Sequence, residues 1–229
     1  MTFADMSTPL RRYVIAVMIG GPVLAALAVV LFMHDGGLSL GDWIRALLLT
    51  VLVAITYSRP LRVAHKFSYD ISEVVHVAMI VLFPPWLPGI LVGVAGALHL
   101  VRRPGWRDAE LFNVSQVMIY VTISAVCLEM LRDQPDFGPA LAGLPPLGAI
   151  GAASAVLLVI NLSLVAGAIA LETQARFWRL LRGHLRNVAP TCLALVALGI
   201  VTALVVRDYP VALAPLILPA GLAQYALQR

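Results

Sequence analysis

Charged residues are scarce in this chain of 229 residues: aspartate, glutamate, lysine and arginine make up 12% of it, against 61% hydrophobic residues. Soluble domains are about one-quarter charged. The scarcity extends along the whole chain, whose mean hydropathy is +0.93. It excludes a soluble fold and predicts an all-α polytopic integral membrane protein. We expect a single transmembrane domain over residues 1–229, because no aqueous loop is long enough to fold separately.

Cysteine and catalytic motifs are also scarce. The two cysteines, Cys127 and Cys192, are expected to differ in depth by roughly 15–20 Å, too far for a disulfide. The sequence has no G-x-S-x-G, H-E-x-x-H, P-loop or Gly-rich dinucleotide motif, so it predicts neither an enzyme activity nor a cofactor. The net charge of +4 is interpreted as cytoplasmic loops facing anionic membrane lipids, with no nucleic acid partner.

Long apolar runs are abundant. They predict membrane helices over residues 13–33, 43–57, 111–131, 147–171, 188–206 and 211–227. The first exceeds the roughly 7–15 residues of a signal-peptide core, so we expect it to be a retained helix. A further run, 71–101, would be roughly 46 Å long as one helix, against a hydrocarbon core of about 30 Å. Pro84, Pro85 and Pro88 interrupt it. We predict a short hairpin with helices over 67–83 and 89–101.

The distribution of basic residues supports the hairpin. If the chain turns back within 71–101, then 13 of the 16 lysines and arginines lie inside, and Arg45, Arg132 and Arg207 lie outside. If 71–101 crosses once, the split becomes 7 inside and 9 outside. We therefore predict eight membrane segments with both termini cytoplasmic, in a bacterial cytoplasmic membrane. The count leaves open whether 71–101 spans fully or is re-entrant.

Two ionisable residues lie near the start of the predicted hairpin. Glu73 and His76 share a helical face with Tyr69 and Ser72. Ionisable residues inside a membrane usually face a protein interior or cavity. Alternatively, the acidic residues are interfacial caps and salt-bridge partners, the reading we adopt for Asp70. His99 could join His76 and Glu73 at a metal, but no spacing motif supports this, and we predict no metal site.

A second set of polar residues forms a stripe on the helix predicted over 111–131. Asn113, Gln116, Tyr120, Ser124 and Cys127 lie within about 80° of one another. Such a stripe is not expected to face lipid: it either hydrogen-bonds to neighbouring helices or lines a polar pocket. Asn161, an isolated polar residue in the middle of its predicted helix, is expected to bond to a neighbouring helix or to join the same pocket.

Small residues follow the proline break. Gly89, Gly93 and Gly96 lie on one helical face, where small side chains allow close approach of another helix. The pattern predicts tight packing against the preceding arm or against the helix that contains Asn113.

Residues 172–187 have the pattern of a basic amphipathic helix. Four arginines lie on one face, namely Arg176, Arg179, Arg182 and Arg186. The apolar residues on the opposite face are Phe177, Trp178, Leu181 and Leu185. We interpret this segment as lying on the cytoplasmic lipid surface. The alternative is a helical extension of its neighbours with a solvated arginine face.

Residues 66–131 carry a loose family resemblance. An acidic-polar start, "SYDISEVVHVAMIVLF", is followed by a proline break, a Gly-rich arm ending in "VRRPGW", and a span opening "LFNVSQ". This order resembles the multi-helix membrane input regions of bacterial HD-type phosphohydrolase and GGDEF-type signalling proteins. More distantly, it is similar to the substrate-binding components of energy-coupling-factor vitamin transporters. The resemblance implies that Phe112, Asn113, Asp70 and Glu73 matter for the core or a ligand site.

We therefore hypothesise a membrane-embedded sensor that binds a small molecule and signals to a cytoplasmic domain or partner after Arg229. Its candidate pocket comprises Glu73, His76, Asn113, Gln116, Tyr120 and Asn161. A transporter component for a small, vitamin-like solute and a structural membrane subunit are the alternatives.

Overall fold

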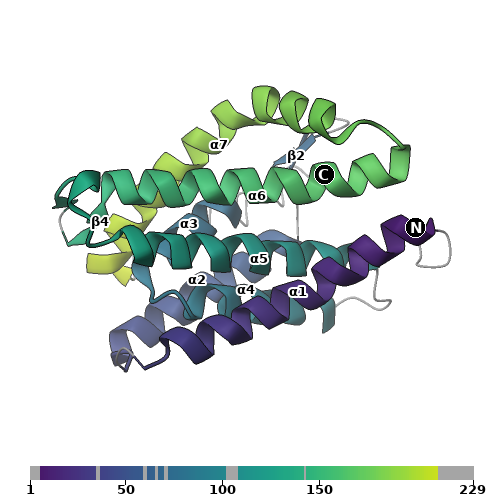
Figure 1. The fold of residues 1–229 in the computed structure, drawn as a ribbon. Coiled ribbons are helices and arrows are strands. Elements are labelled where there is room, and N and C mark those ends of the chain that lie inside the picture. Colours follow the sequence, from purple (N-terminus) through teal and green to yellow (C-terminus); the bar gives the residue numbers. More distant parts are fainter. Residues whose placement is uncertain are drawn as a thin grey trace.

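The computed structural model describes residues 6–34, 37–58, 61–64, 67–69, 72–101, 108–141 and 143–210. The predicted last span, 211–227, and the predicted cap Asp70 lie outside the described residues. The described chain is a bundle of helices with two short β-hairpins (Figure 1). Five of these helices are long and apolar enough to cross a membrane, which confirms the all-α, multi-pass membrane class.

The elements follow one another in the order α1 (Thr8–Phe32), α2 (Leu40–Ser58), β1 (Leu61–Ala64), β2 (Phe67–Tyr69), α3 (Ser72–Leu82), α4 (Leu87–Val101), α5 (Asp108–Leu131), η2 (Pro135–Phe137), β3 (Ala140–Leu141), β4 (Leu144–Pro146), α6 (Leu147–Thr173) and α7 (Phe177–Asp208). β1 pairs with β2 and β3 with β4, both antiparallel.

The connections gather at two ends of the bundle (Figure 1). The end of α1, the start of α2, the strands β3 and β4 and the end of α7 lie at one end, on the left of the figure. The start of α1 and the α6–α7 connection lie at the other. The second end is called here the N-terminal end of the bundle, and the first the β4 end.

The start of α2 is fixed by a reciprocal capping box. The Asp42 backbone N–H donates to Ser39 Oγ (3.2 Å), and the Ser39 N–H donates to Asp42 Oδ2 (3.1 Å). Each side chain thus satisfies a donor that the first helical turn leaves unpaired. Arg45 then bonds both Asp42 (2.7 Å) and the carbonyl of Arg207 (2.7 Å), which ties α2 to the end of α7.

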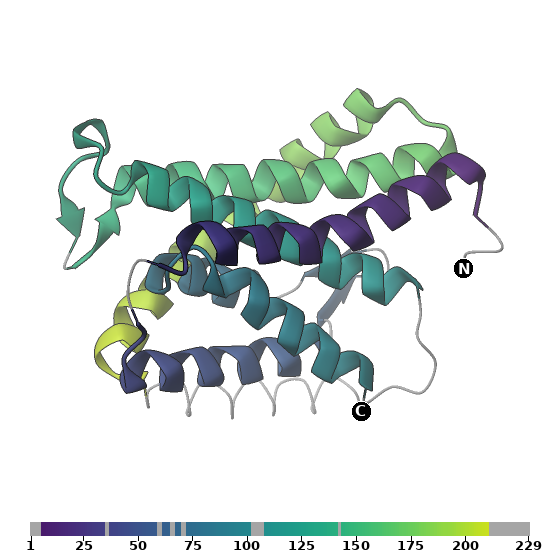
Figure 2. The same ribbon diagram turned by 60° about the horizontal axis from the view of Figure 1, so that its bottom comes forward.

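The proline-rich stretch separates two helices. α3 ends at Leu82, and α4 begins at Leu87 after a turn closed by the Leu87 N–H donating to Pro84 O (3.0 Å). α3 packs mainly on α7, α2 and α5, whereas α4 packs on α5 and α2. Figure 2 shows α4 between α2 and the layer formed by α1 and α5.

Two of the expected helix boundaries are wrong. The helix predicted over 67–83 begins only at Ser72, because residues 67–69 form β2 and pair with β1. The segment 172–187 is not a separate helix between two spans. α6 ends where Gln174 adopts a left-handed backbone (φ 56°), and residues from Phe177 onward belong to α7, which continues through Pro190 to Asp208.

α3 is enclosed by the other helices. Nine of its 11 residues are buried, and only Glu73 and Leu82 are partly accessible. At 1.5 Å per residue the helix is about 16 Å long, roughly half of a hydrocarbon core. A helix this short and buried on all sides places its polar residues inside the bundle.

Candidate functional site

The polar residues of α3 lie on its first turns. Glu73 is partly buried and His76 is fully buried, with 0% of its surface exposed. Residues three apart on a helix share a face. Each of the two side chains begins a separate branch of hydrogen bonds to neighbouring helices.

The first branch joins α3 to α5, α6 and α7. Gln116 Nε2 of α5 donates to Asn161 Oδ1 of α6 (2.7 Å), and Asn161 Nδ2 donates to Glu73 Oε1 (3.2 Å). The Cys192 thiol of α7 donates to Glu73 Oε2 (3.5 Å). Asn161 is the bridge, because its amide offers both an acceptor and donors.

The second branch surrounds the His76 ring with two phenols. Tyr120 OH of α5 lies 3.2 Å from Nδ1, and Tyr57 OH of α2 lies 3.4 Å from Nε2. In a neutral imidazole one nitrogen donates and the other accepts, so one phenol would donate and the other accept. The Tyr57 ring also meets His99 of α4 edge-on, with centroids 6.4 Å apart.

The two branches are adjacent. Gln116 and Tyr120 are four residues apart on α5 and face Glu73 and His76, which are three apart on α3. The polar cluster is defined here as Tyr57, Glu73, His76, Gln116, Tyr120, Asn161 and Cys192. Five helices contribute to it.

The polar cluster lies near the middle of the bundle. Asn161 is 14 residues from the start of α6 and 12 from its end. At 1.5 Å per residue this places it about 20 Å from either end. Interactions at this depth take place away from bulk water, where polar groups must be satisfied by one another.

The structure brings together five of the six predicted pocket residues and leaves out Asn113. Its side chain is exposed and has no hydrogen bond to a described residue. The physical reason is its position on α5. Asn113 lies a turn closer to the helix start than Gln116, where the neighbouring helices no longer cover that face.

The far end of the predicted polar stripe has a packing role. Ser124 is fully buried, and its Oγ has no hydrogen-bond partner among the described residues. Cys127 is half-buried. The polar face of α5 is therefore a hydrogen-bonded site only at Gln116 and Tyr120.

Sequence reasoning missed two members of the polar cluster. Neither Tyr57 nor Cys192 was among the candidate pocket residues. Tyr57 meets His76 across 19 positions of the chain and Cys192 meets Glu73 across 119. No local spacing pattern encodes such contacts. The polar groups of His76 and Glu73 need hydrogen-bond partners inside a membrane, which indicates that partners exist but not which residues they are.

The glycine ridge of α4 lies against α5. A Cβ at Gly89, Gly93 or Gly96 would meet Thr122, Met118 and Val114, respectively. These three contacts recur every four residues on α5, so the two backbones run close together along the ridge. Gln116 and Tyr120 lie on the other side of α5, where they reach α6 and α3, respectively.

The arginine-bearing start of α7 differs from the predicted lipid-lying helix. Its apolar residues Leu181, Phe177 and Leu185 pack against Leu162 and Ala166 of α6 rather than facing outward. The segment is thus a helical extension of the span, as the alternative interpretation had it. That its arginines contact lipid stays a prediction. All four are exposed: Arg176, Arg179, Arg182 and Arg186.

The chemistry available to the polar cluster is hydrogen bonding and proton exchange. It combines a carboxyl, an imidazole, two carboxamides, two phenols and a thiol, contributed by five helices. Within the described part of the chain, no three His, Cys, Asp or Glu residues converge as metal ligands. Comparison with known proteins gives no match to a family model, a curated protein or a solved structure.

Proposed function

We propose that this protein is a membrane-embedded sensor whose ligand site is the polar cluster. The observation that carries the proposal is the joining of five helices by hydrogen bonds at mid-depth around α3. Ionisable and amide groups are costly inside a membrane, and they are usually functional where they occur. Packing alone gains about 0.6 kcal/mol from each such bond on average, which is little reason to place a carboxyl there.

The ligand class follows from the groups that would receive it. Gln116, Asn161 and Glu73 Oε1 form one chain of two hydrogen bonds, and a ligand could take the place of a protein partner in either bond. A small polar solute with hydrogen-bond donors would replace the Asn161 contact to Glu73 and keep the carboxyl satisfied. The surrounding phenols of Tyr57 and Tyr120 suit an aromatic or partly apolar body.

Signalling requires that a ligand bound at the polar cluster changes the position of a helix that reaches the cytoplasmic side. α7 contains Cys192, which contacts Glu73, and its start carries the four arginines. A ligand that binds one position of α7 better than another would shift that equilibrium. Together with the resemblance of residues 66–131 to signalling input regions, this supports coupling to a cytoplasmic domain or partner.

The topology proposed here has eight membrane segments with both termini cytoplasmic, in a bacterial cytoplasmic membrane. It is supported by the arrangement of the described arginines: Arg11, Arg12 and the four at the start of α7 belong to the N-terminal end of the bundle. Arg45, Arg132 and Arg207 belong to the β4 end. α3 contacts β4, which belongs to the β4 end of the bundle.

Cysteine labelling tests this topology. In a chain whose native cysteines are replaced by alanine, Gln134→Cys lies at the β4 end and Glu172→Cys at the N-terminal end, and both positions are exposed. We expect a membrane-impermeant maleimide to label Gln134→Cys in intact cells. Glu172→Cys should be labelled only after permeabilisation. The reverse pattern would invert the topology and move the arginine-rich side outside.

Co-purification tests the ligand site. The full chain, purified in mild detergent, is denatured and its small-molecule content measured by mass spectrometry. We expect one compound to be enriched with the wild type. The amount that co-purifies should fall at least tenfold in Gln116→Leu, because that change removes a hydrogen-bond donor of the polar cluster. Asn113→Leu, on the same helix but exposed, is the matched control and should retain the compound.

Two results would count against the sensor. If the wild type enriches no compound over the control purification, the polar cluster is structural and the chain is a membrane subunit without a ligand. If Asn113→Leu loses the compound as completely as Gln116→Leu, the site lies elsewhere.

A transporter component is the second candidate. The observation that favours it is the pair of short apolar helices α3 and α4, separated by prolines, of which α3 bears two members of the polar cluster. Interrupted helices near the bilayer midplane often form the binding sites of transporters. Uptake of the identified compound into vesicles containing the protein would favour transport over sensing.

A further inference from the structure

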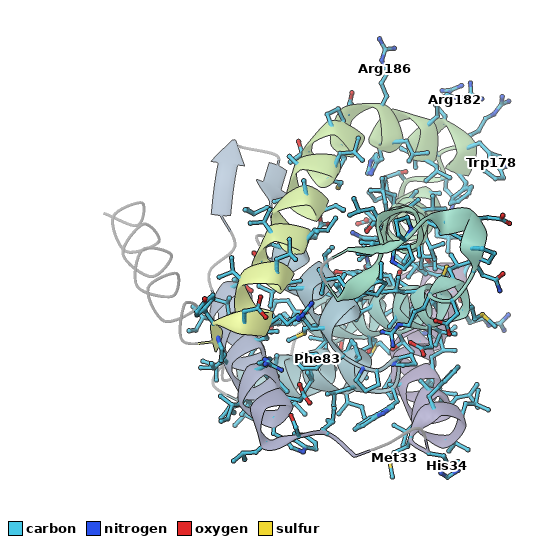
Figure 3. All side chains as sticks on the ribbon, turned by 90° about the vertical axis from the view of Figure 1, so that its left-hand side faces the viewer. Met33, His34, Phe83, Trp178, Arg182 and Arg186 are labelled. Atoms are coloured by element: carbon cyan, nitrogen blue, oxygen red, sulfur yellow. The ribbon has the colours of Figure 1, made fainter. Side chains whose placement is uncertain are left out.

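The start of α7 presents a row of arginines on the outside of the bundle. Arg176, Arg179, Arg182 and Arg186 are spaced three or four residues apart and are all exposed. None of them forms an ion pair with a described residue. Figure 3 shows Arg182, Arg186 and Trp178 pointing away from the bundle. The molecule thus holds four positive charges on one surface without internal compensation from the described residues.

The surface around these arginines is a depression, and packing against α6 holds its orientation in place. The four arginines, with Phe177, Trp178 and Gly183, line a shallow open depression. Leu181, on the opposite side of the helix, is buried against α6. Core packing therefore sets the rotation of this helix, and the arginines stay outward whether or not lipid is present. A freely floating amphipathic helix would instead orient only by inserting its apolar face.

The tryptophan on this surface is itself outward. Trp178 is 74% exposed, and its ring meets Phe177 edge-on with centroids 5.1 Å apart. Tryptophan is enriched at the boundary between headgroups and acyl chains, because its indole is largely apolar and its N–H is polar. A tryptophan among arginines is a combination suited to the headgroup layer, not to bulk water.

We infer that this surface, the arginine row with Trp178, is a binding site for anionic phospholipid headgroups. Guanidinium groups match phosphate oxygens with paired, charge-assisted hydrogen bonds, and the row offers four of them. Long arginine side chains also extend to the headgroup layer from a helix that lies partly below it. The negative charge of such lipids is the complement that the described protein residues do not supply.

The inference is tested with 1-palmitoyl-2-oleoyl phosphatidylglycerol as the probe and the matching phosphatidylcholine as the neutral control. The full chain is titrated with each lipid in detergent, and bound lipids are counted by native mass spectrometry. Each basic residue near a headgroup surface strengthens binding roughly fivefold. We expect Arg179→Gln with Arg182→Gln to weaken phosphatidylglycerol binding about tenfold or more and to leave phosphatidylcholine binding unchanged.

A matched control separates a local site from overall charge. Arg11→Gln with Arg12→Gln removes the same charge from exposed positions of α1 at the same end of the bundle. This variant should change phosphatidylglycerol binding by less than about threefold, since charges beyond the contacting row are screened. If the first pair fails to fold, Arg176→Gln with Arg186→Gln replaces it.

Two outcomes overturn the inference. One is a wild type that binds both lipids equally, which would leave the arginine row for a soluble acidic partner. The other is an equal loss in the α1 pair and the α7 pair, which would reduce the effect to net charge. Neither outcome bears on the small-molecule site, because the polar cluster is unchanged in every variant.

Discussion

Gly21→Ala is expected to lower the free energy of unfolding by about 2–3 kcal/mol. Gly21 of α1 is buried against α5, and a Cβ added there would lie 2.5 Å from the Ser115 carbonyl oxygen and 2.9 Å from its Cα. Backbone atoms cannot rotate aside, so the two helices must separate. The measurement is equilibrium unfolding in mixed detergent micelles, followed by far-ultraviolet circular dichroism.

Two other glycines serve as controls for the Gly21 contact. At Gly93 the nearest atom to an added Cβ is the flexible end of Met118 (3.0 Å), and at Gly151 nothing lies within 4 Å. All three changes gain the same helix propensity, so differences between them isolate the contact. We expect Gly93→Ala to cost less than about 1 kcal/mol. Gly151→Ala meets no neighbour and should raise stability by up to about 1 kcal/mol. Equal stabilities for all three variants would show that α1 and α5 can move apart to accommodate the added methyl group at little cost in stability.

The membrane class and the proline break could be predicted because each depends on local chemistry. Hydropathy over about 20 residues reflects the solvent that a helix meets. Pro84, Pro85 and Pro88 remove backbone donors in one short stretch, so two helices were expected where the structure has α3 and α4. The start of α3 could not be placed, because "LRVAHKFSY" contains no Gly, Pro or Asn turn signal for the β1–β2 hairpin.

Helical periodicity explains both the success and the error at the site. The 100° rule correctly placed Glu73 with His76, and Gln116 with Tyr120, on common faces. The same rule grouped Asn113 with Gln116, but an angle around the axis says nothing about where along the axis the neighbours end. Asn113 falls beyond that point and is exposed. Partners on other helices, such as Tyr57 and Cys192, depend on packing that no single helix encodes.

The start of α7 shows why amphipathicity is ambiguous in a membrane protein. The pattern correctly separated the arginines from Phe177, Leu181 and Leu185. It wrongly placed Trp178 with these apolar residues, because Trp178 is exposed and lies among the arginines. The apolar face of a helix, however, can be covered by lipid or by the side of another helix, and its residue spacing is the same in both cases. Here α6 supplies Leu162 and Ala166 as the apolar partner. Whether lipid or protein covers the apolar face thus depends on a tertiary contact. That contact forms because the chain turns back at Gln174, so that the start of α7 lies against α6.

Asn161→Leu is expected to lower the free energy of unfolding by about 1–3 kcal/mol. Asn161 accepts from Gln116 (2.7 Å) and donates to Glu73 (3.2 Å), and leucine can do neither. The loss of two intramembrane hydrogen bonds alone would cost about 1.2 kcal/mol. The buried Gln116 amide then keeps only a weak contact to the residue 161 carbonyl (3.5 Å), which adds a desolvation cost. Unfolding by denaturing detergent measures the difference.

Removing both partners should cost less than the sum of the single changes. In the double variant Gln116→Leu with Asn161→Leu, no amide remains buried without its partner, and two apolar side chains pack where the bond was. We expect a coupling energy of about 0.5–2 kcal/mol from this double-mutant cycle. Asn113→Leu, exposed and without a described partner, should change stability by less than about 0.5 kcal/mol. Strictly additive single changes would mean that Gln116 and Asn161 do not act through one another, and the polar cluster would then lack the bridge on which its first branch depends.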